Sequence, residues 1–419
     1  MDHSLKIFIL SGEASGDTYG AALIEALRLQ VPAISFIGAG GPKMQAAILE
    51  SQIKDSEVTS EGESSSSSRS AKFEKSLMYS HHPMKAFDHW MEESAVVGLS
   101  DVLKKYGYFR RKFSQFLQEL QEEKPEAIIL IDYPGFNLRL AKAIRRQKLP
   151  IKIFYYISPQ VWAWKKNRIP KMARLLDLMI CIFPFEKELY ESSGLPTTFV
   201  GHPLVETIMA SKNQTTPPLR EKNLLALFPG SREREVRRLF PVMILAFKEM
   251  IKSEPHLCAQ AAAATPGLAT IMQSMVQEAD VPISITIGKA SELMQRATFG
   301  LVCSGTATLE AACYGLPYLL VYKVAWLTYI VGKTLIRVPF LGIINILAGR
   351  LIVREFIQKE ATPKALAETA LKYFTTPQAC DHLSKQLSEV ISTLHGQGAY
   401  DKAAATMLEY LNLKKYAIS

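Results

Sequence analysis

The stretch LLALFPGSREREVRR, residues 224–238, predicts a buried strand, a tight loop and the start of a helix. Its first five residues form an unbroken apolar run, which is typical of a strand inside a parallel sheet. Ser231 is the expected N-cap, and two glutamates follow in the first helical turn, where the helix dipole favours acids. The backbone N–H groups of such a helix start bind anions, and the planar guanidinium of Arg232 suits phosphate. The alternative is an ordinary βα turn with an exposed arginine.

Strand and helix patterns alternate in the same way through both halves of the 419-residue chain. Apolar strands are expected at residues 5–10, 34–37, 127–131, 151–157, 177–183, 197–200, 224–228, 257–264, 283–287, 299–303 and 317–321. The predicted fold class is therefore α/β, with two Rossmann-like doubly wound domains and C-terminal helices. The expected domains are residues 1–209 and 223–375, joined by a polar linker at 210–222. Helices in 376–419 are expected to pack back on the first domain or on a second subunit.

Composition restricts the class of protein without naming a function. Hydrophobic residues make up 48% of the chain and charged residues 21%, as in a globular protein, and the net charge is +9. Such a charge suits nucleic acid, an anionic membrane surface or a phosphorylated substrate, but the sequence has no nucleic-acid-binding motif. Five scattered cysteines without a CxxC pair indicate reduced thiols in the cytosol. We find no signal peptide and no apolar run of the ~18 residues that a membrane span requires.

A polar, serine-rich segment at residues 51–93 is expected to be a low-complexity surface insertion in the first domain. Apolar residues at helical spacing follow from residue 96 to residue 120, flanked by lysines and arginines. This pattern suits either a core-facing amphipathic helix or a surface that docks acyl chains and anionic head groups. Under the second interpretation, the membrane or acceptor contacts are Val97, Leu99, Val102, Leu103 and Tyr106.

Residues at the carboxyl ends of the expected strands are the candidates for chemistry, because ligands of parallel α/β sheets bind at that edge. Gly12 follows the first strand in a loop that lets a ligand or a helix come close. Asp132 follows the strand 127–131 and suits either a general base or a cap of the next helix. Trp162 lies beside basic residues and suits contact with a sugar or lipid, or ordinary packing.

The second half carries further candidates after its own strands. Ser304, Gly305 and Thr306 are small residues at a helix start, where a phosphate can approach the backbone. Glu310 follows one to two turns later and suits the hydroxyls of a ribose, or is an ordinary solvated glutamate. Asn345 is isolated among apolar neighbours, which predicts that its amide holds either backbone or ligand.

Ten segments, in this order, resemble lipid-A-disaccharide synthases and cover almost the whole chain apart from the serine-rich insertion. They are GEASGD (12–17), GGPKMQ (40–45), AVVGL (95–99), ID with FNLRL (131–132 and 136–140), SPQVWAW (158–164), FPFE (183–186), FVGHP (199–203), PGSR with EV (229–232 and 235–236), SGTATLE (304–310) and NILAGR (345–350). Each segment alone is common, but their joint order is specific. The chain departs from the family in its long insertion and in the residues GII (342–344), where Ser-Leu-Pro is expected before Asn345.

The resemblance implies a B-type glycosyltransferase (GT-B) fold, with the donor in a cleft between the two domains. It implies that 2,3-diacylglucosamine passes from its UDP derivative to the 6-hydroxyl of 2,3-diacylglucosamine 1-phosphate, in lipid A biosynthesis. The products are a β(1→6) tetraacyl disaccharide 1-phosphate and UDP, with inversion at the anomeric carbon. By this likeness the protein is cytoplasmic and peripheral, on the cytoplasmic face of the inner membrane. Whether it forms a homodimer is left open.

Inversion by one direct displacement suggests roles for the candidate residues. Asp132 is the expected general base, and Arg232 is expected to stabilise the leaving diphosphate together with the helix starts after Ser231 and Ser304. Glu310 is expected to hold the ribose, and the backbone at Gly288 to face the uracil. Further donor contacts are expected at Gly12, Ser158, Gly305, Thr306 and Asn345, and a further acceptor contact at Trp162.

No cofactor is expected, and no metal, because the sequence has no paired acidic ligand of DxD type in a fitting place. Two alternatives remain at this point. One is another UDP-sugar enzyme of the same fold, such as a 2-epimerase. The other is a non-catalytic protein that binds a UDP-sugar or a lipid.

Overall fold

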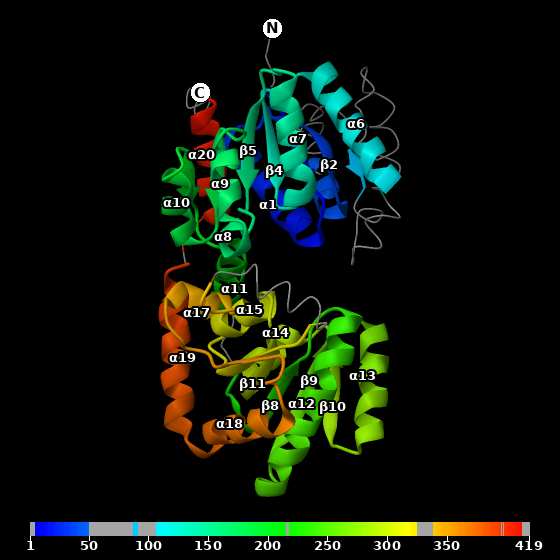
Figure 1. The fold of residues 1–419 in the computed structure, drawn as a ribbon, viewed down its shortest axis with the longest axis vertical. Coiled ribbons are helices and arrows are strands. Elements are labelled where there is room, and N and C mark those ends of the chain that lie inside the picture. Colours follow the sequence, from blue (N-terminus) through cyan, green and yellow to red (C-terminus); the bar gives the residue numbers. More distant parts are fainter. Residues whose placement is uncertain are drawn as a thin grey trace, which may run out of the picture. The chain divides into compact units, whose positions relative to one another are not determined.

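The computed structural model describes residues 5–49, 87–90, 106–214, 218–324, 338–394, 396 and 398–412. The chain divides into two compact units (Figure 1). Unit 1 consists of Met1–Val161, Lys166–Pro203 and Gly398–Ser419, and unit 2 of Trp162–Lys165 and Leu204–Gln397. Each unit is built around its own parallel sheet, which confirms the predicted α/β fold class.

A seven-stranded parallel sheet forms the centre of unit 1, in the order β3-β2-β1-β4-β5-β6-β7. Its strands are β1 (Lys6–Ser11), β2 (Ser35–Gly40), β3 (Asp88–His89), β4 (Ala127–Ile131), β5 (Lys152–Tyr156), β6 (Leu178–Cys181) and β7 (Thr197–Phe199). Every residue of β4 is buried, as expected for a central strand with both faces covered. Phe8, Leu130 and Tyr155 belong to one hydrophobic cluster that packs the sheet against its helices.

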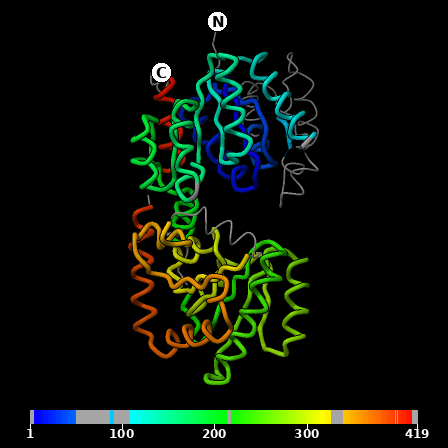
Figure 2. Tube along the Cα trace, in the orientation of Figure 1, coloured from blue at the N-terminus to red at the C-terminus, as the bar shows by residue number. Residues whose placement is uncertain are grey.

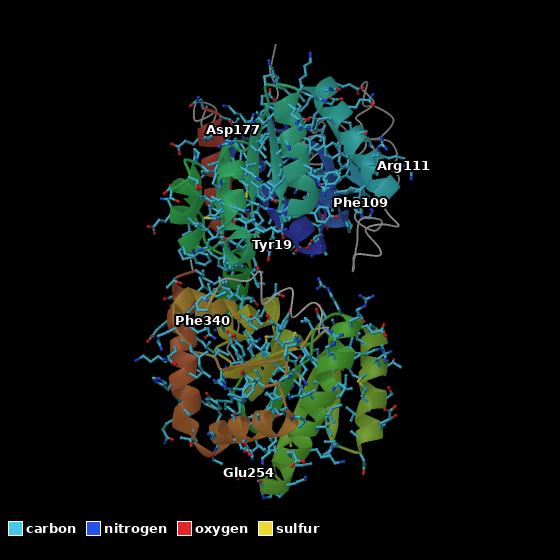
Figure 3. All side chains as sticks on the ribbon, viewed as in Figure 1. Tyr19, Phe109, Arg111, Asp177, Glu254 and Phe340 are labelled. Atoms are coloured by element: carbon cyan, nitrogen blue, oxygen red, sulfur yellow. The ribbon has the colours of Figure 1, made fainter. Side chains whose placement is uncertain are left out.

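Helices connect the strands of unit 1 and cover the sheet. They are α1 (Ala14–Gln30), α6 (Tyr106–Glu123), α7 (Pro134–Arg146), η1 (Lys166–Arg168), α9 (Ile169–Ala173), α10 (Pro184–Glu191) and α20 (Ala399–Tyr410). The short helix α8 (Val161–Trp164) begins in unit 1 at Val161, and its other residues belong to unit 2. α20 comes from the end of the chain and packs against α1 and β6; Figure 2 shows it in red within unit 1. In Figure 3, Tyr19 marks the first turns of α1, beside the carboxyl edge of the sheet, and Asp177 marks the amino edge, just before β6.

Unit 2 contains a six-stranded parallel sheet in the order β10-β9-β8-β11-β12-β13. Its strands are β8 (Glu221–Phe228), β9 (Cys258–Ala263), β10 (Ile283–Ile287), β11 (Ala297–Cys303), β12 (Tyr318–Tyr322) and β13 (Glu355–Ile357). Its helices are α11 (Pro203–Gln214), α12 (Glu233–Ser253), α13 (Pro266–Ala279), α14 (Ala290–Arg296), α15 (Thr306–Cys313), α17 (Ile343–Ala348), α18 (Pro363–Thr375) and α19 (Pro377–Ser392). Residues 224–238 thus form most of β8, the loop after it and the start of α12.

Regular structure reaches into the segment that the sequence suggests as a linker. α11 continues to Gln214 and β8 already begins at Glu221, so part of 210–222 is helix or strand. The C-terminal helices also separate. α19 packs against α15, α17 and α18 of unit 2, because its buried stripe, which includes Leu383 and Leu387, is covered there, whereas α20 packs in unit 1.

Trp90 lies in the segment expected as a surface insertion, yet it is one of the largest buried side chains, with 1% of its surface exposed. Its indole nitrogen donates a hydrogen bond of 2.7 Å to the carbonyl oxygen of Ser11, at the end of β1. Its ring meets those of Phe116 and Tyr133 edge-on, with centroids 5.3 and 6.0 Å apart. The segment therefore supplies part of the core of unit 1.

The remainder of residues 51–93 lies outside the described residues, apart from 87–90. The same holds for four expected membrane or acceptor contacts, Val97, Leu99, Val102 and Leu103, and for the side chain of Tyr106 at the start of α6. Across the stretches that are described, no helix is both long and apolar enough to cross a membrane.

Replacement of Trp90 by alanine is expected to lower the free energy of unfolding of unit 1 by about 3–5 kcal/mol, because it leaves a large cavity in a closed core. Urea unfolding followed by circular dichroism measures this loss. The control is Leu29→Ala on α1, where the side chain is 81% exposed and the change should stay within about 0.5 kcal/mol. Equal midpoints for the two variants would show that Trp90 does not stabilise the core.

Candidate active site

Each sheet has one topological switch point, where the order of the strands along the chain reverses. In unit 1 it lies between β1 and β4, and in unit 2 between β8 and β11. The loops after these strands leave toward opposite faces of the sheet, so a crevice opens at their carboxyl ends, and ligands of doubly wound sheets bind there. Asp132 follows β4, Arg232 follows β8 by four residues, and Ser304 follows β11 directly. Asp132, Arg232 and Ser304 thus lie at switch points.

Asp132 occupies an unusual backbone conformation directly after β4. Its φ is +43° and that of Tyr133 is +47°, so two successive residues with side chains are left-handed. The backbone carbonyl of Asp132 accepts hydrogen bonds from the amide of Asn137, at 2.7 Å, and from the hydroxyl of Tyr155. The turn therefore places the carboxyl group of Asp132 at the switch point by a defined set of contacts.

The carboxyl group of Asp132 is more basic than an ordinary aspartate. Burial and the negative charge of nearby Glu13 raise its pKa to about 6, and the backbone N–H of Tyr133 opposes them in part. At pH 7 such a group is still mostly ionised. Its pKa lies closer to the working pH than that of an ordinary aspartate, as is usual for a general base that takes a proton from a hydroxyl group. A group of this basicity is suited to accepting a proton, and the role of Asp132 as general base stays a prediction.

Gly12 and its neighbours pack the loop after β1 against the loop after β4. A Cβ atom on Gly12 would lie 2.6 Å from the ring of Tyr133, and one on Gly16 would lie 2.4 Å from the hydroxyl of Ser11. Asp17 is buried and accepts the backbone N–H groups of Gly41, Lys43 and Met44. Close packing against the side chains of Tyr133 and Ser11 explains these glycines, so a role of Gly12 in donor binding stays a prediction.

Ser158 and Trp162 are buried in the structure. The hydroxyl of Ser158 donates to the carboxylate of Glu186 at 2.8 Å and lies 2.9 Å from the hydroxyl of Tyr190. Only 5% of the surface of Trp162 is exposed. Ser158 thus has two internal partners, and the burial of Trp162 fits the packing role that the sequence left open.

The loop after β8 presents Arg232 to solvent. Gly230 has φ +122°, and a Cβ there would lie 2.5 Å from the carboxylate of Glu235, so only glycine fits. α12 begins at Glu233, and Arg232 rather than Ser231 occupies the N-cap position, because the chain is still extended at Arg232 (φ −112°, ψ 140°). The expected cap at Ser231 is therefore wrong by one residue. The side chain of Arg232 is 71% exposed and lies 3.5 Å from Glu235.

The loop after β11 exposes its backbone to solvent. Gly305 has φ +142° with open space on its Cβ side, and Gly305 and Thr306 are exposed. Glu310 is half-buried in α15, and burial raises its pKa. Gly288 directly follows β10, is exposed and has φ +69°. Gly288, Gly305 and Thr306 are thus exposed to solvent, and their contact with a donor stays a prediction.

The amide of Asn345 is fully used inside the protein. Its nitrogen donates to the carbonyl of Val353 at 2.7 Å and to the carboxylate of Glu355 at 2.8 Å, and its oxygen accepts the N–H groups of Ile352 and Val353 at 2.8 Å each. An amide has two donors and two acceptor sites, so none is left for a donor sugar. Of the two expected roles, the structure shows the one in which Asn345 holds the backbone. It does not support the prediction that Asn345 binds the donor.

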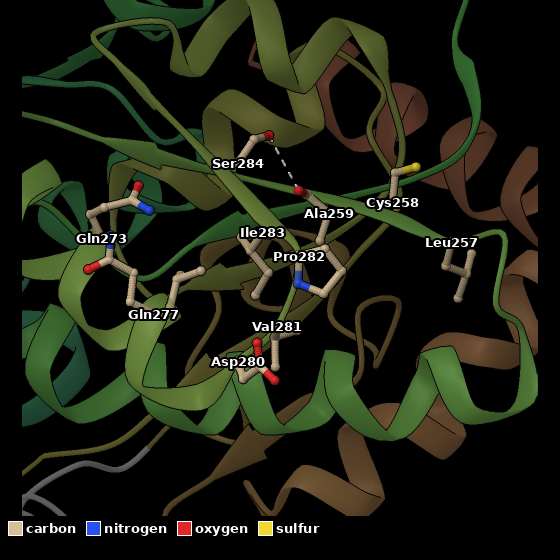
Figure 4. A pocket seen from close by; sticks show the side chains of 11 residues that line it. Leu257, Cys258, Ala259, Gln273, Gln277, Asp280, Val281, Pro282, Ile283 and Ser284 are labelled. Carbon is tan, nitrogen blue, oxygen red and sulfur yellow. Dashed lines mark hydrogen bonds between the residues drawn. The ribbon is translucent and has the colours of Figure 1, made fainter.

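A shallow pocket lies at another part of unit 2 (Figure 4). Residues at the amino ends of β9 and β10 and at the end of α13 line it, including Cys258, Gln277 and Ser284. It contains no predicted site residue and lies at the edge opposite to the carboxyl ends. Among the described residues, no group of three His, Cys, Asp or Glu side chains is placed to hold a metal ion.

Sequence reasoning did not select Glu13, Asn137 or Tyr155 as site residues. Asn137 belongs to one of the ten resembling segments, which is the signal that would have identified it. Glu13 follows β1, so the topology predicts it beside Asp132 once the strand order is known. Tyr155 lies within an apolar strand, and its contact with Asp132 depends on the pairing of β4 and β5, which the sequence does not reveal.

Solved structures share the fold. A UDP-GlcNAc 2-epimerase from Neisseria meningitidis bound to UDP-GlcNAc aligns with a TM-score of 0.58 at 13% identity, over 97% of this chain and 100% of that one. The UDP-GlcNAc 2-epimerase of Methanocaldococcus jannaschii, in complex with UDP-GlcNAc and UDP, aligns with a TM-score of 0.52 at 11% identity, with the same coverage. At this identity the likeness shows the GT-B type of fold alone.

Sequence relatives are much closer. Lipid-A-disaccharide synthases of Trichlorobacter lovleyi and Geobacter metallireducens are 34% and 35% identical over 408 and 416 residues; the alignments cover 96% and 98% of this chain, and 97% and 98% of theirs. The lipid-A-disaccharide synthase 1 of Legionella pneumophila is 34% identical over 409 residues, covering 95% of this chain and 96% of its own.

A family model described as lipid-A-disaccharide synthetase matches residues 7–65 and 84–409. The unmatched residues between them, 66–83, fall within the segment expected as an insertion, whereas Trp90 and both switch points lie in the matched regions. Because the family match spans most of the chain, and because near full-length relatives are more than 30% identical, the chain belongs to the lipid-A-disaccharide synthetase family.

Proposed function

We propose that this protein condenses UDP-2,3-diacylglucosamine with 2,3-diacylglucosamine 1-phosphate to give the β(1→6) tetraacyl disaccharide 1-phosphate and UDP. Family membership supports a glycosyltransferase of lipid A biosynthesis. The observation that carries the mechanism is the raised basicity of Asp132 at the switch point of unit 1. A hydroxyl acceptor needs such a base, and a sugar nucleotide needs the exposed cationic and N–H groups that unit 2 offers.

The reaction is proposed as one direct displacement with inversion. The carboxylate of Asp132 accepts the proton of the acceptor's 6-hydroxyl group while the oxygen of that hydroxyl attacks the anomeric carbon. The bond between this carbon and UDP breaks on the opposite side. Arg232 and the N-terminal N–H groups of α12 and α15 take up the negative charge that develops on the diphosphate. Glu310 holds the ribose hydroxyls, and the turn at Gly288 faces the uracil.

We further propose that the protein works as a peripheral protein at the cytoplasmic face of the inner membrane, since its substrates carry acyl chains. In the described part of α6, Arg110 and Arg111 are exposed, and Figure 3 places Arg111 on the outer side of this helix. Cations at such positions attract anionic head groups, each by roughly 1 kcal/mol near the surface.

The experiment that tests the reaction measures UDP release from UDP-2,3-diacylglucosamine in detergent with chelator, with and without 2,3-diacylglucosamine 1-phosphate. Acceptor-dependent release with a disaccharide product supports both the reaction and its independence of metal. Asp132→Asn is expected to lower turnover by roughly 10²- to 10⁴-fold, because the amide cannot accept the proton. Near-normal turnover of this variant would remove Asp132 from the mechanism. Release without acceptor would instead point to another UDP-sugar reaction.

Activity is expected to fall as the pH decreases through about 6, where Asp132 becomes protonated. Glu13→Gln removes the negative charge that helps to raise this pKa, so the midpoint of the acid limb of kcat should move to lower pH. The measurement is kcat at saturating substrates across this pH range. Glu25→Gln, an exposed glutamate on the same helix α1, is the control and should keep the original midpoint. An identical midpoint in all three proteins argues against a charge coupling between Glu13 and Asp132.

Arg232→Lys is expected to lower kcat/KM by roughly 10- to 100-fold, because lysine keeps the charge but lacks the planar fork that binds phosphate oxygens. Arg238→Lys is the matched control, since Arg238 is an exposed arginine further along α12. Steady-state kinetics with varied donor give the comparison. If both variants behave alike, Arg232 has no special role at the diphosphate.

A further inference from the structure

The turn that carries Asp132 is held in place from inside the sheet. Left-handed backbone is unfavourable for residues with side chains, and it persists only where surrounding contacts determine it. Here two such residues, Asp132 and Tyr133, are consecutive. The contacts that maintain this turn therefore also decide where the carboxyl group of Asp132 lies.

Two buried side chains provide these contacts. The amide nitrogen of Asn137 donates to the carbonyl oxygens of Ile131, at 3.1 Å, and Asp132, at 2.7 Å. The hydroxyl of Tyr155, on the neighbouring strand β5, donates to the same carbonyl of Asp132. Both side chains have 0% of their surface exposed. They reach Asp132 from α7 and from β5, so two different elements fix one peptide group.

The packing around Tyr133 closes the turn on its other side. Its ring lies against Gly12, where a Cβ atom would not fit, and edge-on to Trp90. Backbone N–H groups of Phe136 and Asn137 donate to the carbonyl of Tyr133 at 3.2 and 3.1 Å, which joins the turn to the start of α7. The turn is thus a rigid support rather than a loose loop end.

We infer that Asn137 and Tyr155 are positioning residues for catalysis: through the backbone carbonyl of Asp132 they hold its carboxyl group at the switch point. The inference rests on the proposed role of Asp132 as the base. A catalytic base acts efficiently only when it is held within hydrogen-bonding distance of the proton that it accepts, and a displacement of ~1 Å can cost about 10²-fold in rate. Neither residue is assigned to contact the substrate.

The groups that face Asp132 allow this role to be tested by pH. Glu13 from the start of α1, Tyr133 of the turn and Tyr155 of β5 are its titratable neighbours. Burial raises the pKa of Tyr155 far above its ordinary value, so its hydroxyl stays protonated and remains a donor. When the turn loosens, Asp132 gains water and loses its fixed position near Glu13, and both changes lower its pKa.

Tyr155→Phe is the first variant, because it removes a single hydroxyl and keeps the ring. We expect kcat to fall about fivefold, as for the loss of one buried hydrogen bond, with KM for both substrates changed by less than about twofold. The acid limb of kcat should move to lower pH. Tyr156→Phe is the matched control: it removes a buried hydroxyl from the next residue of β5, on the other face of the sheet, and should leave kcat and the acid limb unchanged.

Asn137→Ala is the second variant and removes both amide hydrogen bonds, so kcat should fall roughly 10- to 100-fold if the protein folds. Circular dichroism and urea unfolding check folding, and if this variant is unfolded, Tyr155→Phe decides alone. Wild-type kcat and an unmoved acid limb in Tyr155→Phe would overturn the inference, as would equal effects of Tyr155→Phe and Tyr156→Phe.

Asp132→Asn, measured in the same assay, distinguishes failure of the positioning role from failure of the base assignment. If it is inactive while Tyr155→Phe is normal, only the positioning role fails. If Asp132→Asn keeps near-normal turnover, the base assignment fails and the positioning role fails with it. Loss in Asp132→Asn together with a kcat loss and a shifted acid limb in Tyr155→Phe supports both.

Discussion

Parallel pairing of the strands is the constraint on which the rest of the structure depends. A parallel connection must return across the sheet, so helices cover both faces and the central strands are apolar throughout, as β4 is. Within such a strand a charged side chain has no favourable place. The first position where a carboxylate can occur is the residue after the strand ends, and Asp132 occupies that position. The topology thus confines chemistry to one edge of each sheet.

The same edge makes the carboxylate of Asp132 reactive. The surrounding loops partly bury this carboxylate, and the reversal of strand order at β1 and β4 brings Glu13 close to it. Both effects disfavour the ionised form and raise the pKa of Asp132. A residue in this state tends to move toward water or to a cation, and the hydrogen bonds from Asn137 and Tyr155 to its backbone oppose that movement. Rigidity of the turn and basicity of the side chain are therefore linked.

Much of the fold was predictable because buried parallel strands appear in the sequence as apolar runs. The strands 127–131 and 283–287 coincide with β4 and β10. The short strands β3 and β13 were missed, because neither forms an apolar run: β3 consists of Asp88 and His89, and β13 begins with Glu355. Trp90 was missed for a different reason: it lies in a largely polar segment, near Asp88, His89, Glu92 and Glu93, and only the three-dimensional packing against Phe116 shows that it is core.

The structure divides the predicted site residues into exposed and buried ones, and this division has a physical cause. A motif records that a residue type is needed, but not whether it faces a ligand or holds the loop that does. Arg232 and Gly305 are exposed, so their side chain and backbone remain available to a donor. Ser158 and Asn345 stand in equally recognisable segments, yet their polar groups bond to Glu186, Glu355 and backbone.

A buried polar group must find its partners inside the protein, because leaving it unpaired costs more than the hydrogen bond contributes. Buried residues such as Ser158 and Asn345 therefore specify the shape of the loops. Exposed residues such as Arg232 and Gly305 are presented to solvent by that shape. The amide of Asn345 shows the limit of this argument most clearly: once its two donors and two acceptors are satisfied by Val353, Ile352 and Glu355, further binding would require breaking a bond that holds the loop itself.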